Sequence, residues 1–294
     1  MEQTQLSIII PFYNGERFTD SIINNIEGVI REFKDIKVEF LIVVDSPKSQ
    51  LNFNNRCIKI IKNKQNMGIH YSRVHGLKES IGKYIIFLDQ DDEIIPSEVF
   101  TAYTKLLNNS SADIIVSNGF FEFPDKKLKR IYSHNFNKKT ITKEFYYLNV
   151  KSLIISPGQC IIKKDSIPLE WIEHIMDING TDDYLLWLLM FNSDKKFLYN
   201  DRIVYIHKDS GENVSFNPQQ WKSSLGNMEK ILNEIEGYEK FKVKKIKRLN
   251  EYKFNLVTKS KVNFFVKSLK NLDLFWINFL FYVSNGHTVK NHRN

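Results

Sequence analysis

Hydrophobic residues in the first half of the chain form short uninterrupted runs that alternate with segments of helical periodicity. The run Leu6–Ile10 ends at Pro11, and apolar residues then recur at three- and four-residue spacing from Phe18 to Phe33. This pattern predicts a strand followed by a helix, and continuous apolar runs are typical of strands buried on both faces of a parallel sheet. Further strands are predicted at Val38–Val44, Cys57–Ile61, Tyr84–Leu88 and Asp113–Val116, and further helices at Met67–Ser80 and from Pro96. The alternation predicts an α/β fold with a mostly parallel, Rossmann-like sheet flanked by helices.

The second half of the chain is less regular. A turn at Ser156–Gln159 interrupts it, and Pro218 is predicted to open a helical C-terminal extension. The predicted elements between them are the strands Cys160–Ile162 and Ile203–Ile206 and the helix Tyr184–Phe191. We therefore divide the chain into a domain of residues 1–215 and an extension of residues 216–294.

Polar clusters follow three of the predicted strands. They are Pro11–Asn14, Asp45 and Asp89–Asp92. Ligands of parallel sheets bind at the carboxyl ends of the strands, so these clusters are expected to gather at one edge of the sheet.

The third cluster is acidic and is a candidate metal site. Asp89, Asp91 and Asp92 follow directly on the apolar run Tyr84–Leu88. Such close carboxylates repel one another unless a cation or water screens them, and residues two apart at a strand end point the same way. Hard oxygen ligands suit Mg²⁺ or Mn²⁺ that also binds substrate phosphates. The alternative is a solvated turn in which an aspartate caps the next helix.

Composition bounds the class of protein. The chain has 294 residues, of which 42% are hydrophobic and 26% charged, as in an ordinary globular protein. Two distant cysteines, Cys57 and Cys160, argue against a disulfide scaffold and fit a reducing cytoplasm. The N-terminal segment has no basic region and its apolar run stops at Pro11, so we expect no signal peptide.

Positive charge is concentrated at the C-terminal end. Residues 240–294 hold 13 Lys and Arg against 2 acidic residues, a net charge of +11, whereas the whole chain has +8 and the other residues therefore −3. A basic tail can meet nucleic acid, an anionic membrane or an acidic partner, or it can be a solvated helical face. The tail aromatics Tyr252, Phe254, Phe264 and Phe265 fit amphipathic helices as well as a stacking platform, and we predict no nucleic-acid partner.

The segment Leu272–Val283 is aromatic and apolar but too short to span a bilayer. It follows the lysines 259, 261, 267 and 270. This combination predicts an interfacial helix on the inner face of an anionic membrane. The alternative is that the segment packs on the catalytic domain or on a second subunit of a homo-oligomer.

Several motifs occur together in a specific order between Leu6 and Ser215. They are SIIIPFYN, LIVVD, NMGIHYSRVHGL, GKYIIFLDQDD, SPGQCIIKK, GTDDYLLWLLM and YIHKDSGENVS. The ordered set resembles family 2 glycosyltransferases of the GT-A fold, of the kind that build bacterial surface polysaccharides. The resemblance implies an enzyme that moves a sugar from a nucleotide-sugar donor, by default a UDP-sugar, to a hydroxyl of a lipid-linked or protein-linked glycan.

The resemblance also implies roles for individual residues. Asp183 would be the catalytic base, with Asp182 next to it; Asp91, with Asp89 and His207, would hold Mn²⁺ or Mg²⁺. The donor would meet Pro11, Tyr13, Asn14, Asp45, Asn66, Arg73, Asp89 and Gln90. The acceptor or sugar side would hold Gly158, Gln159 and Trp187.

Each of these assignments has an alternative. Asp182 and Asp183 can simply cap the helix that follows them, and His207 can be a structural histidine. Arg73 can be a surface arginine, Gly158 a turn residue, and Trp187 a core residue.

One segment departs from the family. Where the family often reads Asp-Asp-Gly-Ser, this chain reads Asp45-Ser46-Pro47-Lys48, which leaves the contacts to the base and ribose in question. The implied reaction is a direct displacement in which a carboxylate takes the proton of the attacking hydroxyl, and the single displacement inverts the anomeric centre. The alternative is a non-catalytic nucleotide-sugar-binding partner subunit, whose mark would be the loss of the acidic motifs.

Overall fold

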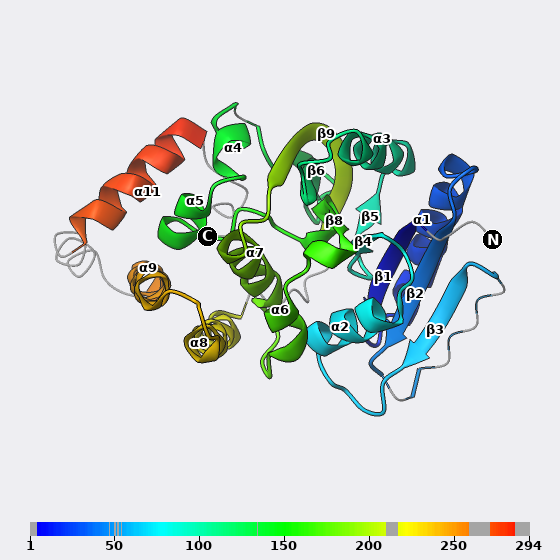
Figure 1. Cartoon of the computed structure of the whole chain (residues 1–294), viewed down its shortest axis with the longest axis horizontal. Coiled ribbons are helices and arrows are strands. Elements are labelled where there is room, and N and C mark those ends of the chain that lie inside the picture. The colour runs from blue at the N-terminus through cyan, green and yellow to red at the C-terminus, as the bar shows by residue number, and fades with distance from the viewer. Residues whose placement is uncertain are drawn as a thin grey trace.

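A single mixed sheet with helices on both faces forms the centre of the molecule in the computed structural model (Figure 1). The structure describes residues 5–46, 48, 49, 51, 53, 55–133, 135–209, 217–258 and 271–285. Among these residues the strand order is β3-β2-β1-β4-β8-β6-β9-β5, with β7 paired to β6. The strands are β1 (Leu6–Phe12), β2 (Val38–Val44), β3 (Ile58–Lys62), β4 (Tyr84–Phe87), β5 (Glu93–Ile94), β6 (Ile114–Glu122), β7 (Leu128–Arg130), β8 (Cys160–Lys163) and β9 (Phe197–Lys208).

The first four strands are parallel, as the apolar runs predict. β1 lies between β2 and β4, and β2 lies between β1 and β3. The right-handed crossovers from β1 to β2 and from β3 to β4 run in opposite directions along the sheet. They therefore put the helix of the first crossover, α1 (Thr19–Glu32), and the helix of the second, α2 (Ile69–Glu79), on opposite faces. The helices are α1 (Thr19–Glu32), α2 (Ile69–Glu79), α3 (Pro96–Leu107), α4 (Asn135–Thr140), α5 (Glu144–Asn149), α6 (Leu169–Glu173), α7 (Asp182–Asn192), α8 (Pro218–Glu234), α9 (Lys240–Thr258) and α11 (Leu272–Asn285). Short 3₁₀ turns lie at Glu16–Phe18, Pro157–Gln159 and Lys164–Ser166.

The second half of the sheet contains more strand than the sequence predicts. β6 continues beyond Val116 to Glu122, and β9 begins at Phe197 rather than Ile203. β6 is parallel to β9 but antiparallel to β7 and β8, and β8 is antiparallel to β4. The α/β fold is therefore confirmed, and its sheet is parallel in the first half and mixed in the second.

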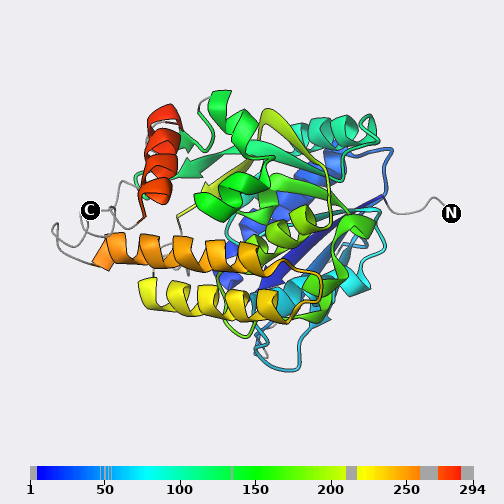
Figure 2. The same ribbon diagram turned by 60° about the vertical axis from the view of Figure 1, so that its left-hand side comes forward.

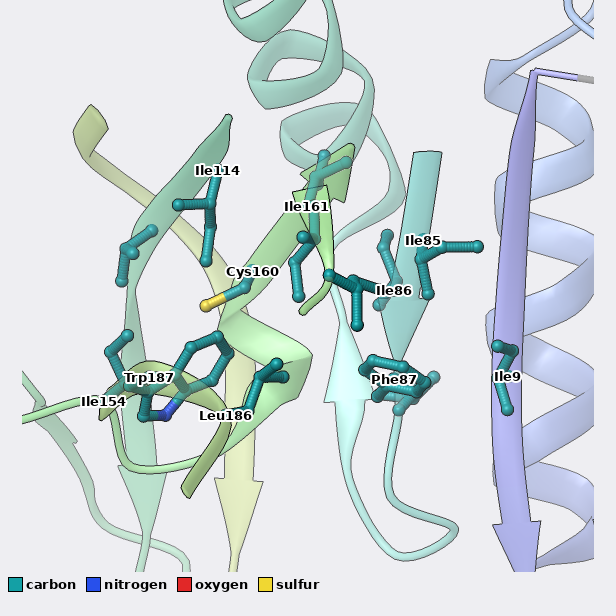
Figure 3. Packing of buried hydrophobic residues seen from close by; sticks show 14 of the residues in the cluster. Ile9, Ile85, Ile86, Phe87, Ile114, Ile154, Cys160, Ile161, Leu186 and Trp187 are labelled. Atoms are coloured by element: carbon teal, nitrogen blue, oxygen red, sulfur yellow. The ribbon is translucent and has the colours of Figure 1, made fainter. Parts of the chain in front are cut away.

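The buried core runs through the sheet into α7. Figure 3 shows it from Ile9 on β1, across Phe87 on β4 and Cys160 on β8, to Leu186 and Trp187 on α7. Trp187 is fully buried there. Its indole therefore lies in the core and not on an acceptor surface, which corrects the sugar-side role that the resemblance gave it.

The C-terminal extension is helical, as predicted, and it packs on the rest of the protein. α8 begins at Pro218, and the Asn217 side chain caps it by accepting from the amides of Gln219 and Gln220. The main core includes buried residues of α8, α9 and α11: Met228, Ile231, Leu232, Val243, Ile246 and Phe281. Several predicted features lie outside the described residues. They are the boundary between residues 215 and 216, the GENVS end of the motif YIHKDSGENVS, the lysines 259, 261, 267 and 270, and Phe264 and Phe265. None of the helices in the described part of the chain has the length and apolar character needed to cross a membrane.

Candidate active site

The three polar clusters predicted at the strand ends meet through hydrogen bonds. The backbone N–H of Tyr13 donates to Gln90 Oε1 at 2.9 Å, and Gln90 Nε2 donates back to the Tyr13 carbonyl at 3.1 Å. The N–H of Asn14 donates to Ser46 Oγ at 2.7 Å, beside Asp45. Pro11 lies within β1 and pairs with Val43 of β2. Tyr13 follows Phe12, the last residue of β1, and is 49% exposed.

Arg73 links the acidic motif after β4 to the acidic pair at the start of α7. Its two terminal nitrogens lie 2.5 Å from Asp89 Oδ1 and 2.5 Å from Asp182 Oδ2. The Arg73 side chain is only 4% exposed, so it is not the surface arginine of the alternative interpretation. Although burial opposes the charge, the carboxylates of Asp182 and Asp89 raise the pKa of Arg73. The guanidinium therefore stays charged and holds two carboxylates that are 93 positions apart in the sequence.

Asp182 and Asp183 open α7 with different surroundings. Asp182 is buried: its carboxylate meets Arg73, and its carbonyl accepts from the Trp171 indole N–H at 2.8 Å. Asp183 is half-buried, and its Oδ1 accepts from the Tyr184 amide at 2.7 Å. Burial, and then the neighbouring Asp182, raise the pKa of Asp183 to about 7. A carboxyl group with that pKa can accept a proton near neutral pH.

Ser156 is a site residue that the sequence analysis did not single out. Its Oγ donates to Asp89 Oδ2 at 3.3 Å, while Arg73 occupies Oδ1. The turn that carries Ser156 is held by Gln159, whose Oε1 accepts from the amide of Ile155 and whose Nε2 donates to the Ser117 carbonyl. Gly158 and Gln159 are both buried, so they shape this turn instead of forming an acceptor surface. A Cβ on Gly158 would lie 2.6 Å from the Tyr205 ring.

Asp92 turns out to serve the fold rather than to complete a cluster of three metal ligands. It is 1% exposed, and its carboxylate accepts from the Tyr205 hydroxyl and from the Lys208 amide, the latter at 2.9 Å. His207 Nδ1 lies 3.2 Å from the same carboxylate. Burial is the largest influence on the pKa of His207 and lowers it, but the charge and hydrogen bond of Asp92, together with the charges of Asp89 and Asp91, raise that pKa overall. Asp92 thus fixes the end of β9 and orients the His207 ring beside the acidic motif.

Asp45 supports the segment that leads into α2. Its Oδ1 accepts from Asn63 Nδ2 and from the Met67 amide, and its Oδ2 accepts from the Gly68 amide, all within 2.8 Å. Asn66 is exposed and accepts from the same Gly68 amide at 3.2 Å. Asn179, which the sequence analysis did not single out, accepts from the Ile69 amide at 3.0 Å and joins this segment to the loop before α7.

The geometry links Arg73 to Asp89 and Asp182, and Gln90 to Tyr13. Trp187, Gly158 and Gln159 occupy buried positions. With respect to known proteins, a family model described as Glycosyl transferase family 2 matches residues 7–168.

Relatives and solved structures agree with this match. An uncharacterized glycosyltransferase of Methanocaldococcus jannaschii is 26% identical over 207 residues, which cover 67% of this chain and 68% of the relative. The minor teichoic acid biosynthesis protein GgaB of Bacillus subtilis is 37% identical over 171 residues, which cover 55% of this chain but only 18% of that protein. The crystal structure of S. aureus TarS in complex with UDP-GlcNAc has a TM-score of 0.61 at 16% identity and covers 87% of this chain and 76% of that one, which shows a shared fold.

Proposed function

The chain belongs to glycosyl transferase family 2, and from that premise we propose that it transfers a sugar, with inversion, from a nucleotide-sugar to a hydroxyl of a glycan acceptor. One observation carries the proposal: Arg73 holds Asp89 of the acidic strand-end motif and Asp182 of the acidic pair at 2.5 Å each. The donor-side motif and the candidate base, Asp183, are thereby fixed in one site.

The nucleotide is assigned to the edge formed by Tyr13, Asn14 and Gln90. The reciprocal bonds between Gln90 and the Tyr13 backbone fix this edge, and the exposed Tyr13 ring offers a face on which a base can stack. The carboxylate of Asp45 already accepts hydrogen bonds from three donors in the segment that carries Asn66. Asp45 is therefore assigned to positioning this segment beside the nucleotide. UDP is the expected nucleotide, supported by the fold shared with a UDP-GlcNAc-bound structure.

The acidic motif fits a divalent cation that is held largely by the donor's diphosphate. Within the described residues no three His, Cys, Asp or Glu side chains form a closed metal site. A cation shared with phosphates needs only one or two protein carboxylates, however, and Asp91 stands two residues after Asp89 in the acidic motif. We assign Asp91 as the direct ligand of Mn²⁺ or Mg²⁺, with Asp89 and His207 beside it; when bound, the cation would neutralise charge on the departing diphosphate.

Asp183 is assigned as the base. Its carboxylate takes the proton of the acceptor hydroxyl while the hydroxyl oxygen forms a bond to the anomeric carbon. The bond from that carbon to the phosphate oxygen breaks, and its electron pair leaves with the nucleoside diphosphate. Attack from the face opposite the leaving group inverts the anomeric centre. The acceptor class, a surface polysaccharide or glycoconjugate, is supported by the similarity to a teichoic acid biosynthesis protein.

The test is donor turnover across UDP-, GDP- and dTDP-sugars, with and without Mn²⁺. We expect release of one nucleoside diphosphate that depends on the metal and is abolished in Asp91→Ala. Asp183→Asn should lower acceptor transfer by about 10²- to 10⁴-fold and leave donor binding intact. Asp125→Asn, on the exposed turn between β6 and β7, is the matched control and should leave transfer unchanged.

Two results would redirect the assignment. Near-full transfer by a folded Asp183→Asn variant would remove Asp183 as the base. Absence of both turnover and binding for every nucleotide-sugar would favour a non-catalytic partner subunit.

A further inference from the structure

Helix α11 is apolar on the side that faces solvent as well as on the side that packs on the protein. At 100° per residue, Leu274, Asn278 and Phe281 share one face, and all three are buried. The opposite face carries large apolar side chains that are 48% to 67% exposed: Leu272, Trp276, Phe279, Leu280 and Val283. We call this set the α11 apolar face.

An exposed apolar stripe of this kind marks a surface that is covered in the working state of a protein. The Trp276 and Phe279 rings lie 5.7 Å apart and form an aromatic group on the stripe. The helix has 14 residues and cannot cross a bilayer, but an aromatic apolar face of this length suits the headgroup boundary of one.

The neighbouring helix α9 presents positive charge. Its exposed face carries Lys240, Lys244, Lys245 and Lys247. The two helices adjoin where Arg248 on α9 holds both carboxylate oxygens of Asp273 on α11, at 2.7 and 2.5 Å. Lys242 differs, because it is buried against Glu144 and Glu239. The exposed charge of α9 thus lies on its solvent side, on the helix that adjoins α11 at the Arg248–Asp273 ion pair.

We propose that the α11 apolar face and the exposed lysines of α9 form a docking surface for an anionic phospholipid bilayer. Apolar side chains would enter the headgroup boundary while the lysines meet lipid phosphates. A second copy of the chain fits this surface less well, since it would bring the exposed lysines of two α9 helices together.

Docking here would hold the candidate active site in a fixed relation to the lipid. Figure 1 places α8, α9 and α11 at the end of the molecule opposite β2 and β3, and Figure 2 shows α8 and α9 running side by side. Asn278 on α11 donates to the Asn149 carbonyl at the end of α5, and α5 packs on α7, which begins with Asp182 and Asp183. The proposal goes beyond sugar transfer and does not depend on it.

Vesicle co-sedimentation of the full chain tests the proposal. The protein should bind phosphatidylcholine vesicles that contain phosphatidylglycerol, bind pure phosphatidylcholine far more weakly, and lose affinity as salt is raised. Trp276→Ser with Phe279→Ser should weaken binding by about tenfold or more, because both side chains lose their insertion into the boundary. Leu128→Ser on β7, where the leucine is 49% exposed, is the matched control and should bind like the wild type.

A second pair of variants examines the charge. Lys244→Glu with Lys247→Glu should also weaken binding by about tenfold or more. Lys34→Glu with Lys37→Glu makes the same charge change just after α1 and should have little effect.

The proposal is overturned if the wild type does not bind anionic vesicles, or if neither the α9 nor the α11 variants lose affinity. It is also overturned if light scattering shows a dimer that Trp276→Ser with Phe279→Ser dissociates. Donor turnover, measured in parallel, should be unchanged in all variants, so failure of docking and failure of catalysis are separable.

Discussion

Arg73 is a buried cation between two carboxylates, and its removal leaves both without their partner. Breaking a buried ion pair on one side typically costs about 3–5 kcal/mol, because the remaining charge stays desolvated. We expect Arg73→Ala to lower the free energy of unfolding by about 3 kcal/mol in urea titrations.

The matched control for this prediction is Arg202, which pairs with Glu98 at 2.6 and 2.7 Å but is 58% exposed. Arg202→Ala should cost less than about 1 kcal/mol, since exposed pairs are screened by water. An equal loss of unfolding free energy in Arg73→Ala and Arg202→Ala would contradict the view that Arg73 is the principal link in the site.

Asp183 gives transfer a defined pH dependence. The base acts as the carboxylate, and burial raises its pKa to about 7. Activity should therefore be half-maximal near pH 7, approach its full value about one pH unit higher, and fall about tenfold per pH unit well below pH 7, as the carboxylate is protonated. The measurement is kcat/KM against pH in buffers of constant ionic strength. An inflection near the ordinary carboxyl value of about 4 would contradict the assignment.

At the scale of elements, α2 depends on the glycine at its start. Gly68 has a φ of 88° and a ψ of 167°, and a Cβ there would lie 2.7 Å from Asn179 Oδ1. This backbone region is essentially restricted to glycine, so Gly68→Ala should lower the free energy of unfolding by about 1–3 kcal/mol.

Gly226, inside α8, is the matched control. A Cβ added at this position would meet nothing within 4 Å, and the residue lies in a helix interior, where alanine is favoured. Gly226→Ala should raise the free energy of unfolding by about 0.5–1 kcal/mol. Thermal or urea unfolding of both variants checks the opposite signs, and destabilisation by both would contradict the argument.

The strands that the sequence predicts best are mostly apolar. β1 and β2 are apolar except for Ser7 and Glu39, β4 is apolar throughout, and their order along the chain already implied one shared edge. β6 could not be followed beyond Val116, because it continues through Ser117, Asn118 and Gly119, where the register with β9 also shifts. Asn118 is buried there with its amide donating to the Tyr132 carbonyl, a partner that no local pattern reveals.

The candidate site likewise contains residues that the sequence predicts and residues that it does not. Asp89, Arg73 and Asp182 stand in motifs that the family resemblance locates. Ser156 and Tyr205 reach the acidic motif through the mixed second half of the sheet, so their contacts follow from strand pairing and not from spacing. The roles assigned to the donor and metal residues stay predictions until they are measured.

At the scale of the whole molecule, the helical extension is part of the same folding unit as the sheet. Residues of α8, α9 and α11 belong to the main core, and Thr181, just before the acidic pair, donates to the Ser224 carbonyl on α8 at 3.2 Å. The net charge is nevertheless divided between a slightly negative body and a strongly positive end. One folded unit therefore carries both the candidate active site and the basic end of the chain.

Trp171 is a fluorescent side chain in contact with the acidic pair Asp182–Asp183. Its indole N–H donates to the Asp182 carbonyl, and its ring centroid lies 4.5 Å from that of His70. The chain has only four tryptophans, so we expect a change at the Arg73–Asp182 bridge to alter the intrinsic fluorescence measurably. The protein thus carries its own emission probe beside the proposed base, and donor or acceptor binding can be followed by fluorescence titration without an added label.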